Sequence, residues 1–192
     1  MTTDDLRAAK ADIRKTVLAQ RDALDPASRI EASITLADHI EDVPAFRSLE
    51  PGTVVSSFLP IRSEIDARPL MAKLAERGAR LCVPVVVDKT TIKFRELVRG
   101  APMVETSFGT IGPDENAAVL TPQIMLIPLA VFDRQGGRIG YGGGYYDRYV
   151  EALDDPSLIG LAFAMQEEAS VPMEKHDRRL HGVLTEQGYI AV

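Results

Sequence analysis

The spacing of apolar residues along the chain predicts four helices. In the first, over 4–23, the apolar residues are spaced by four or seven positions, as on one face of a helix: Leu6, Ile13, Val17 and Leu24. The motif "DPAS" at 25–28 is typical of a helix start, so a second helix is expected from there to about residue 40. Two more helices are expected over 67–78, ending at Gly78, and over 144–153.

Runs of β-branched and other apolar residues between these helices predict strands. The expected strands are 53–60, 80–87, 91–98, 123–133 and 157–164. Strands that alternate with helices indicate βαβ units, so we expect an α/β fold with three layers, α/β/α, around a mostly parallel sheet. The irregular stretch 100–122 is expected to be a working loop rather than a boundary, because no flexible linker accompanies it. The prediction is a single domain over residues 1–192.

The composition of the chain argues against several classes of protein, including those that bind nucleic acid or cross a membrane. The chain is 45% hydrophobic and 26% charged, with 22 basic and 28 acidic residues and a net charge of -6, which argues against nucleic acid as a partner. No apolar run approaches the ~18 residues needed to cross a bilayer, and the first residues lack the apolar core of a signal peptide. The only cysteine, Cys82, excludes an internal disulfide and is expected to be buried. We therefore expect a cytoplasmic protein without a membrane partner, and a monomer.

One segment, "RIGYGGGYYDRYV" at 138–150, concentrates four glycines and four tyrosines between a predicted strand and a predicted helix. Ligands of open α/β sheets bind where strands pass into helices, and glycines there allow backbone N–H groups to approach a phosphate. Arg138 can add a full positive charge. Asp147 falls in the first turn of the predicted helix, where its carboxylate is favoured and could hold a magnesium ion.

The glycine segment taken by itself leaves two interpretations open. It is not a P-loop, because no Lys-Ser/Thr pair follows the glycines. It also fits the dinucleotide fingerprint poorly, since Tyr145 stands at the third glycine position. The alternative to a phosphate site is a glycine-rich turn whose tyrosines pack on the sheet.

The glycine segment resembles the signature loop of the 5-formyltetrahydrofolate cyclo-ligase family, also called methenyltetrahydrofolate synthetase, over "RIGYGGGYYDR". Three further segments match that family in the expected order: "KADIR" (10–14), "SSFLPIRSEID" (56–66) and "HDRRLHGVLTE" (176–186). Together the four segments span nearly the whole chain. The family's fold is similar to that of sugar-phosphate isomerases and CoA-transferases, which is the architecture that the resemblance implies.

The resemblance also implies a role for individual residues. ATP would be bound by Lys10, Arg14, Arg138, Ile139, Gly140, Tyr141, Gly142, Gly143, Gly144, Tyr145 and Tyr146. Arg138 and Tyr146 would be catalytic, and the folate would contact Leu59, Glu64, Tyr141 and Tyr145. Asp147 and Asp177 would hold Mg²⁺. The implied reaction is the ATP-dependent cyclisation of 5-formyltetrahydrofolate to 5,10-methenyltetrahydrofolate, with ADP and phosphate as the other products.

The residue patterns leave plainer alternatives for several of these positions. Lys10 and Arg14 lie four residues apart on one helix face, which could simply be a solvated basic stripe extended by Arg7 and Arg21. Glu64 could be a surface loop acid, and Asp177 could form a surface ion pair with a neighbouring arginine. At the level of function, the alternatives are a non-catalytic nucleotide- or folate-binding protein and a phosphosugar or CoA enzyme of related fold.

Overall fold

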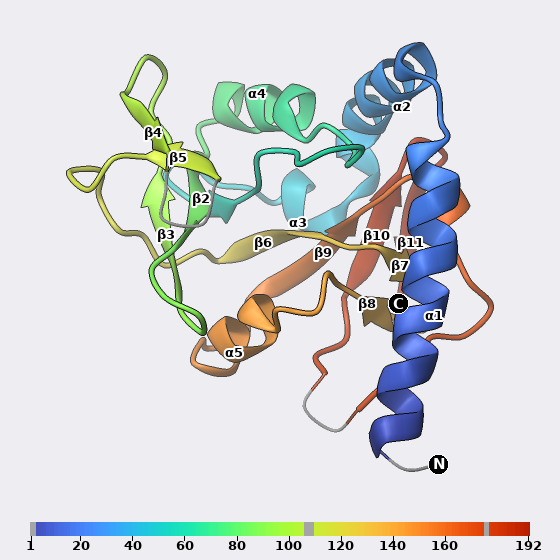
Figure 1. Ribbon diagram of the computed structural model, residues 1–192. Helices are drawn as coiled ribbons and strands as arrows, with labels where there is room; N and C mark the ends of the chain where they lie inside the picture. The colour runs from blue at the N-terminus through green and yellow to red at the C-terminus, as the bar shows by residue number, and fades with distance from the viewer. Residues whose placement is uncertain (1–2, 106–109, 175–176) are drawn as a thin grey trace.

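The computed structural model describes residues 3–105, 110–174 and 177–192, and a seven-stranded sheet forms its centre (Figure 1). The strand order is β11-β10-β9-β6-β1-β2-β3. The strands are β1 (Val54–Ser56), β2 (Arg80–Val86), β3 (Ile92–Glu96), β6 (Ile124–Pro128), β9 (Ser157–Leu161), β10 (Gly182–Thr185) and β11 (Gly188–Ala191). The five inner strands are parallel, and only the two edge strands run antiparallel to their neighbours, which confirms the prediction of a mostly parallel sheet.

Helices cover both faces of this sheet, as expected for three layers. The helical segments are α1 (Thr3–Asp22), α2 (Pro26–Asp38), η1 (His39–Asp42), α3 (Pro44–Arg47), α4 (Arg68–Glu76), α5 (Tyr145–Glu151) and η2 (Ala164–Gln166). Side chains of α2, α3 and α4 pack on one face through Leu36, Phe46 and Leu70. On the other face, Val150 of α5 packs against Met125 and its neighbours, so each face of the sheet has its own apolar core. None of the helices in the described ranges is long and apolar enough to cross a membrane.

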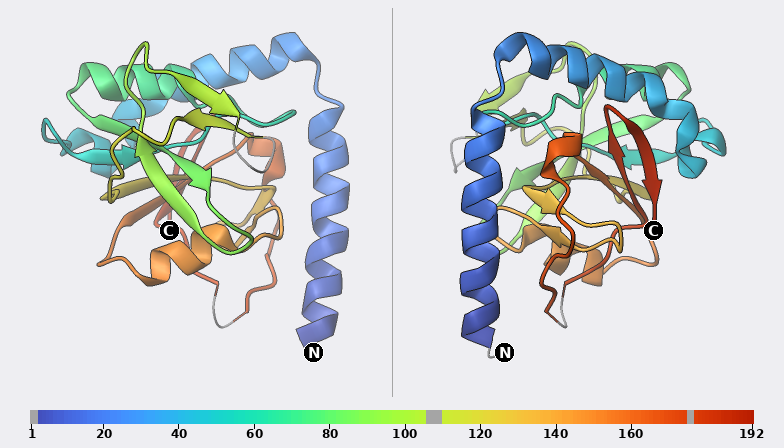
Figure 2. Two further views of the ribbon diagram at one scale, coloured as in Figure 1. Left: turned by 60° about the vertical axis from the view of Figure 1, so that its left-hand side comes forward. Right: turned by 90° about the vertical axis from the view of Figure 1, so that its right-hand side faces the viewer.

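The long helix α1 lies apart from both of these layers. It stands alongside the sheet, on the side toward which β6 runs (Figures 1 and 2). Val17 is almost fully buried against Val131 and Ile139, with Ile13 and Leu18 packed around them. This small apolar cluster fixes α1 beside the carboxyl ends of the parallel strands, which is where ligands bind in sheets of this kind.

Local sequence signals explain where α2 and α4 begin and end. The Asp25 carboxylate accepts hydrogen bonds of 3.0 Å from the backbone N–H groups of Ala27 and Ser28, which confirms it as the cap of α2. Gly78 follows α4 with a φ of +88°, the left-handed conformation that a helix end requires and that glycine adopts without strain.

The predicted strand over 123–133 is wrong as a single element. β6 ends at Pro128, and the buried residues that follow form a separate two-stranded ribbon, in which β7 (Val131–Phe132) pairs with β8 (Arg138–Ile139). An apolar run does not distinguish one buried strand from two, because every residue in it is buried in either arrangement. The break matters for the site, because β8 forms the first two residues of the glycine segment and its glycines follow directly.

Other strand predictions were also too long or were missed. The predicted strands 53–60 and 157–164 are shortened to β1 and β9, because the chain leaves the sheet after Ser56 and Leu161. The hairpin of β10 and β11 was not predicted. The stretch 100–122 contains a second hairpin, made of β4 (Met103–Glu105) and β5 (Ile111–Pro113), although a loop was expected throughout.

Candidate functional site

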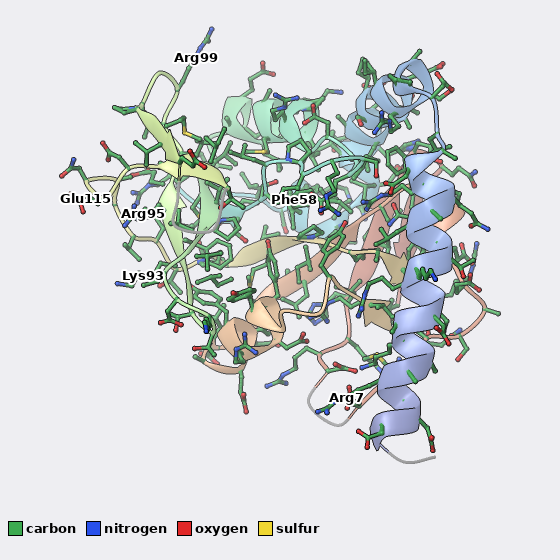
Figure 3. The ribbon with its side chains drawn as sticks, viewed as in Figure 1. Arg7, Phe58, Lys93, Arg95, Arg99 and Glu115 are labelled. Carbon is green, nitrogen blue, oxygen red and sulfur yellow. The ribbon has the colours of Figure 1, made fainter. Side chains whose placement is uncertain are left out.

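A cleft of about 620 Å³ opens at the carboxyl edge of the sheet, between α1, the glycine segment and the end of β6. All the residues that the sequence predicted for ATP and for Mg²⁺ line this cleft. They come from four separate parts of the chain: α1, β8 with the glycine segment, the first turn of α5, and the region of Asp177. Arg7 also projects from α1 toward the cleft (Figure 3).

The glycine segment is held in place by α1. The Arg14 Nε–H donates a 2.7 Å hydrogen bond to the carbonyl oxygen of Gly140. Gly142 and Gly144 have φ values of +94° and +61°, in the left-handed region that side chains other than glycine seldom adopt. Gly144 also precedes α5 without a side-chain cap, so this turn offers backbone donors to the cleft.

Lys10 is buried and paired with two carboxylates. Its ammonium contacts Glu174 Oε2 at 2.9 Å and also donates to Asp177 Oδ2, and only 9% of the residue is exposed. The Glu174 N–H donates a 2.7 Å hydrogen bond to the same Asp177 oxygen, which joins the two acids. Burial lowers the pKa of Lys10, but the hydrogen bonds and charges of Asp177 and Glu174 outweigh burial and raise it. The interpretation of Lys10 as part of a solvated stripe is therefore wrong.

Arg138 and Asp147 form the second ion pair of the cleft. An Arg138 amino group lies 2.6 Å from Asp147 Oδ1, and the other amino group donates to the Arg178 carbonyl oxygen. The Arg138 residue is 6% exposed. Asp147 stands in the first turn of α5, as predicted, and also accepts a 3.3 Å hydrogen bond from the Arg178 N–H. The pair therefore fixes the start of α5 against β8.

The residues predicted for the folate are divided: Tyr141 and Tyr145 line this cleft, whereas Glu64 and Leu59 do not. Glu64 lines a separate groove of about 530 Å³ between α2 and the segment 60–69, and its Oε2 accepts a 2.8 Å hydrogen bond from the Ile61 N–H. Burial raises the pKa of the Glu64 carboxyl, despite the opposing effects of Tyr141, the Ile61 N–H and Arg21. Leu59 is half-buried and packs against the core. Tyr141 connects the two regions, because it lines the cleft and its side chain acts on the Glu64 carboxyl of the groove.

The two neighbouring tyrosines of the glycine segment differ in their surroundings. The Tyr145 ring lies under the Arg148 guanidinium, 5.3 Å from the ring centroid. The Tyr146 ring packs edge-on against Phe94, and its hydroxyl is buried without a hydrogen-bond partner in the described part of the chain. Burial raises the pKa of Tyr146 well above its usual range, so this hydroxyl is a neutral donor. An unpaired buried donor at the wall of a cleft is costly, and a bound ligand would satisfy it.

Several residues of the site were not identified from the sequence, among them Arg7 and Arg148, which line the cleft. Glu174 reaches Lys10 from a segment 164 residues away, and no local pattern signals that contact. Arg21 was interpreted as part of a solvated stripe, but it is only 3% exposed. Its position seven residues after Arg14, two helical turns along the same face, is the signal that could have identified it.

The family model described as the 5-formyltetrahydrofolate cyclo-ligase family matches residues 6–186. A 5-formyltetrahydrofolate cyclo-ligase of Haemophilus influenzae is 29% identical over 138 residues, which cover 68% of this chain and 74% of that protein. The mouse 5-formyltetrahydrofolate cyclo-ligase is 25% identical over 94% of this chain and 95% of its own length.

Solved structures agree with these matches. The solution structure of a 5,10-methenyltetrahydrofolate synthetase of Aquifex aeolicus superposes with a TM-score of 0.79 at 25% identity, covering 95% of this chain and 92% of that one. A 5,10-methenyltetrahydrofolate synthetase of Mycoplasma pneumoniae has the same fold, with a TM-score of 0.73 at 21% identity over 92% of this chain and 98% of that one. Since the family model matches nearly the whole length, this chain belongs to the 5-formyltetrahydrofolate cyclo-ligase family.

Proposed function

We propose that residues 1–192 act as one domain that converts 5-formyltetrahydrofolate into 5,10-methenyltetrahydrofolate, with ATP hydrolysed to ADP and phosphate. The observation that carries this proposal is the single cleft in which Lys10, Arg14, Arg138 and the glycine segment meet two carboxylates of the expected metal site. These groups suit a triphosphate and its cation. The half-open groove at Glu64 lies next to them and suits a second, folate-sized substrate.

In the proposed reaction, the formyl oxygen of the folate attacks the γ-phosphorus of ATP, and ADP leaves. N10 then adds to the formyl carbon and loses its proton, and phosphate leaves with the former formyl oxygen. Phosphoryl transfer of this kind depends on positioning and on neutralising charge rather than on a protein nucleophile. Arg14 and Arg138, on opposite walls of the cleft, would hold the phosphate oxygens, and the N–H groups of the glycine turn would bind the others.

The acidic residues of the cleft fit a magnesium ion. Mg²⁺ prefers oxygen ligands and commonly takes one or two protein carboxylates, with phosphates and waters completing its shell. Asp147 and Asp177 both line the cleft, and each is paired with a cation that can turn to phosphate instead. We propose that these two aspartates hold the ion, which would neutralise charge on the transferred phosphoryl group. Within the described residues, no cluster of three or more metal-binding side chains competes with this assignment.

The folate would lie between the cleft and the Glu64 groove. The Glu64 carboxyl group has acceptor oxygens suited to the N–H groups of a pterin ring. Leu59, Tyr141 and Tyr145 would supply apolar and aromatic contacts, and the unpaired Tyr146 hydroxyl would donate to the oxygen that moves between substrates. This last contact is the role that we assign to Tyr146 as a catalytic residue.

The test follows the near-ultraviolet absorbance of the methenyl product after 5-formyltetrahydrofolate and Mg-ATP are mixed with the protein. We expect an increase that requires both ATP and magnesium, and a loss of at least 100-fold in kcat for Arg138→Ala, typical of a lost charge-stabilising group. Arg80→Ala is the matched control, because Arg80 pairs with Glu96 on the far, exposed side of β2. Binding of ATP without any product would instead favour the non-catalytic nucleotide-binding protein and refute this proposal.

A further inference from the structure

Arg21 is a buried cation whose direct partners are neutral. Its Nε–H donates a 3.0 Å hydrogen bond to Ser63 Oγ, and one amino group donates a 2.6 Å hydrogen bond to the Tyr141 hydroxyl. The guanidinium also lies 5.7 Å from the centroid of the Tyr141 ring. Arg21 is only 3% exposed, and the carboxylate that its charge influences, Glu64, is not one of its direct hydrogen-bond partners among the described residues.

The two partners of Arg21 belong to different halves of the site. Tyr141 stands in the glycine segment, which lines the nucleotide cleft. Ser63 directly precedes Glu64, and its hydroxyl donates to the Asp22 carboxylate at the end of α1. A single side chain from α1 therefore bridges the nucleotide side and the folate side, and its guanidinium lies close enough to influence the Glu64 carboxylate.

A buried charge is costly unless the surrounding groups compensate it, and two neutral acceptors with one aromatic ring compensate less than a carboxylate would. Packing alone gives no reason to retain an arginine at this point. The planar guanidinium, however, fixes two donors in directions set by its geometry, which a lysine ammonium on a flexible stem cannot do. The Arg21 side chain is therefore suited to holding the segments of Tyr141 and Ser63 at a fixed distance from each other.

We propose that Arg21 is a positioning residue that fixes Tyr141 of the glycine segment relative to the Glu64 segment, and so sets the placement of the folate relative to ATP. This inference rests on the proposed function for its assay. Arg21 acts through Tyr141 and Ser63 rather than by touching either substrate. Lys10 and Arg138 have their own ion-pair partners, and Arg14 holds the glycine segment separately through Gly140, so we expect the binding of ATP alone not to require the contact of Arg21.

The test is a double-mutant cycle with Arg21→Lys and Tyr141→Phe, measuring KM for 5-formyltetrahydrofolate, kcat, and ATP binding by calorimetry without folate. Each single variant is expected to raise the folate KM about tenfold while ATP affinity changes less than threefold. The double variant is expected to match either single variant, because both substitutions remove the same contact. Arg21→Gln ends near the position of the arginine Nε, so it can reach Ser63 but not Tyr141, and it should raise the folate KM as Arg21→Lys does.

The outcomes separate this inference from the proposed function. A wild-type protein without turnover refutes the proposed function, whatever Arg21 does. With an active wild type, effects of the two substitutions that multiply in the double variant overturn the bridge. The inference is also overturned if the rise in the folate KM across the variants is explained by their lower melting temperatures alone. If Arg21→Lys fails to fold, Ser63→Ala decides in its place, since it removes the other end of the bridge at a residue that contacts neither substrate: an unchanged folate KM refutes the inference and a tenfold rise supports it.

Discussion

Replacing Lys10 by methionine tests whether the ion-pair cluster at the cleft is as costly to break as its burial implies. The side chains of Lys10, Glu174 and Asp177 are 11%, 13% and 12% exposed, respectively. Removing the Lys10 ammonium takes a buried cation away from two neighbouring carboxylates that are themselves too buried to recover full hydration. Breaking a buried pair in this way costs roughly 3–5 kcal/mol of the free energy of unfolding.

The measurement is urea unfolding of wild type and Lys10→Met, followed by circular dichroism. With an m-value of about 2 kcal/mol/M, a loss of 3–5 kcal/mol lowers the urea midpoint by about 1.5–2.5 M. Lys73→Met is the matched control, because Lys73 pairs with Asp38 at 2.6 Å but the two side chains are 38% and 66% exposed. An exposed pair contributes about 0.2–1 kcal/mol, so this control should shift the midpoint by less than about 0.5 M.

The difference in unfolding free energy between wild type and Lys10→Met should also depend on pH, which gives a second check of the ion-pair cluster. The pKa of Lys10 is raised in the folded protein, since the charges and hydrogen bonds of Asp177 and Glu174 exceed the opposing effect of burial. The contribution of Lys10 is therefore complete below its unfolded pKa of about 10.4 and is lost as the pH rises through the higher folded value. The gap between wild type and Lys10→Met should narrow only above about pH 10.5. A gap below 1 kcal/mol at pH 7.5, or one that does not change up to pH 12, would refute the reasoning.

Three further predictions concern residues away from the cleft. Burial raises the pKa of the Cys82 thiol to about 12, so an aromatic disulfide reagent at pH 8 should label it only after urea is added; rapid labelling of the native protein would contradict this. Gly160→Ala should lower the free energy of unfolding by about 1–3 kcal/mol, because the added Cβ would lie 2.6 Å and 2.8 Å from two leucine side chains. A thermal melt measures this, and an unchanged melting temperature would show that the leucine side chains move aside without cost. Asp133→Ala should lower the free energy of unfolding by about 3 kcal/mol, since the buried Asp133 carboxylate accepts hydrogen bonds from three backbone N–H groups. Urea unfolding measures this, and a loss under 1 kcal/mol would show that water takes the place of the carboxylate.

The residues of the nucleotide cleft could be predicted from the sequence because a topological rule connects them. The carboxyl ends of parallel strands meet at one edge of a sheet, so a glycine segment that follows a strand must lie there. Arg138 and Asp147 belong to one continuous motif, and their ion pair spans only nine residues. The family resemblance added Lys10, Arg14 and Asp177, which local patterns alone could not place beside that motif.

The parts that could not be predicted depend on contacts between distant segments. The burial of Arg21 follows from the packing of α1 beside β7 and β8, and β7 itself was hidden within an apolar run. Strands β10 and β11 have four residues each, too few for an alternating pattern to stand out. Glu174 has no neighbour in the sequence that indicates its partner, because the contact exists only after α1 has docked.

The regular geometry of helix α1 fixes the distance between the two arginines that contact the glycine segment. Arg14 and Arg21 are seven residues apart, which places them about 10.5 Å apart along the axis and about 20° apart around it. Inserting one residue between them would turn one arginine by about 100° relative to the other, and Arg14 could no longer reach Gly140 while Arg21 reached Tyr141. The number of residues in this part of α1 is therefore as tightly constrained as their identities, whereas its first turn, before Arg7, can change in length without altering this spacing.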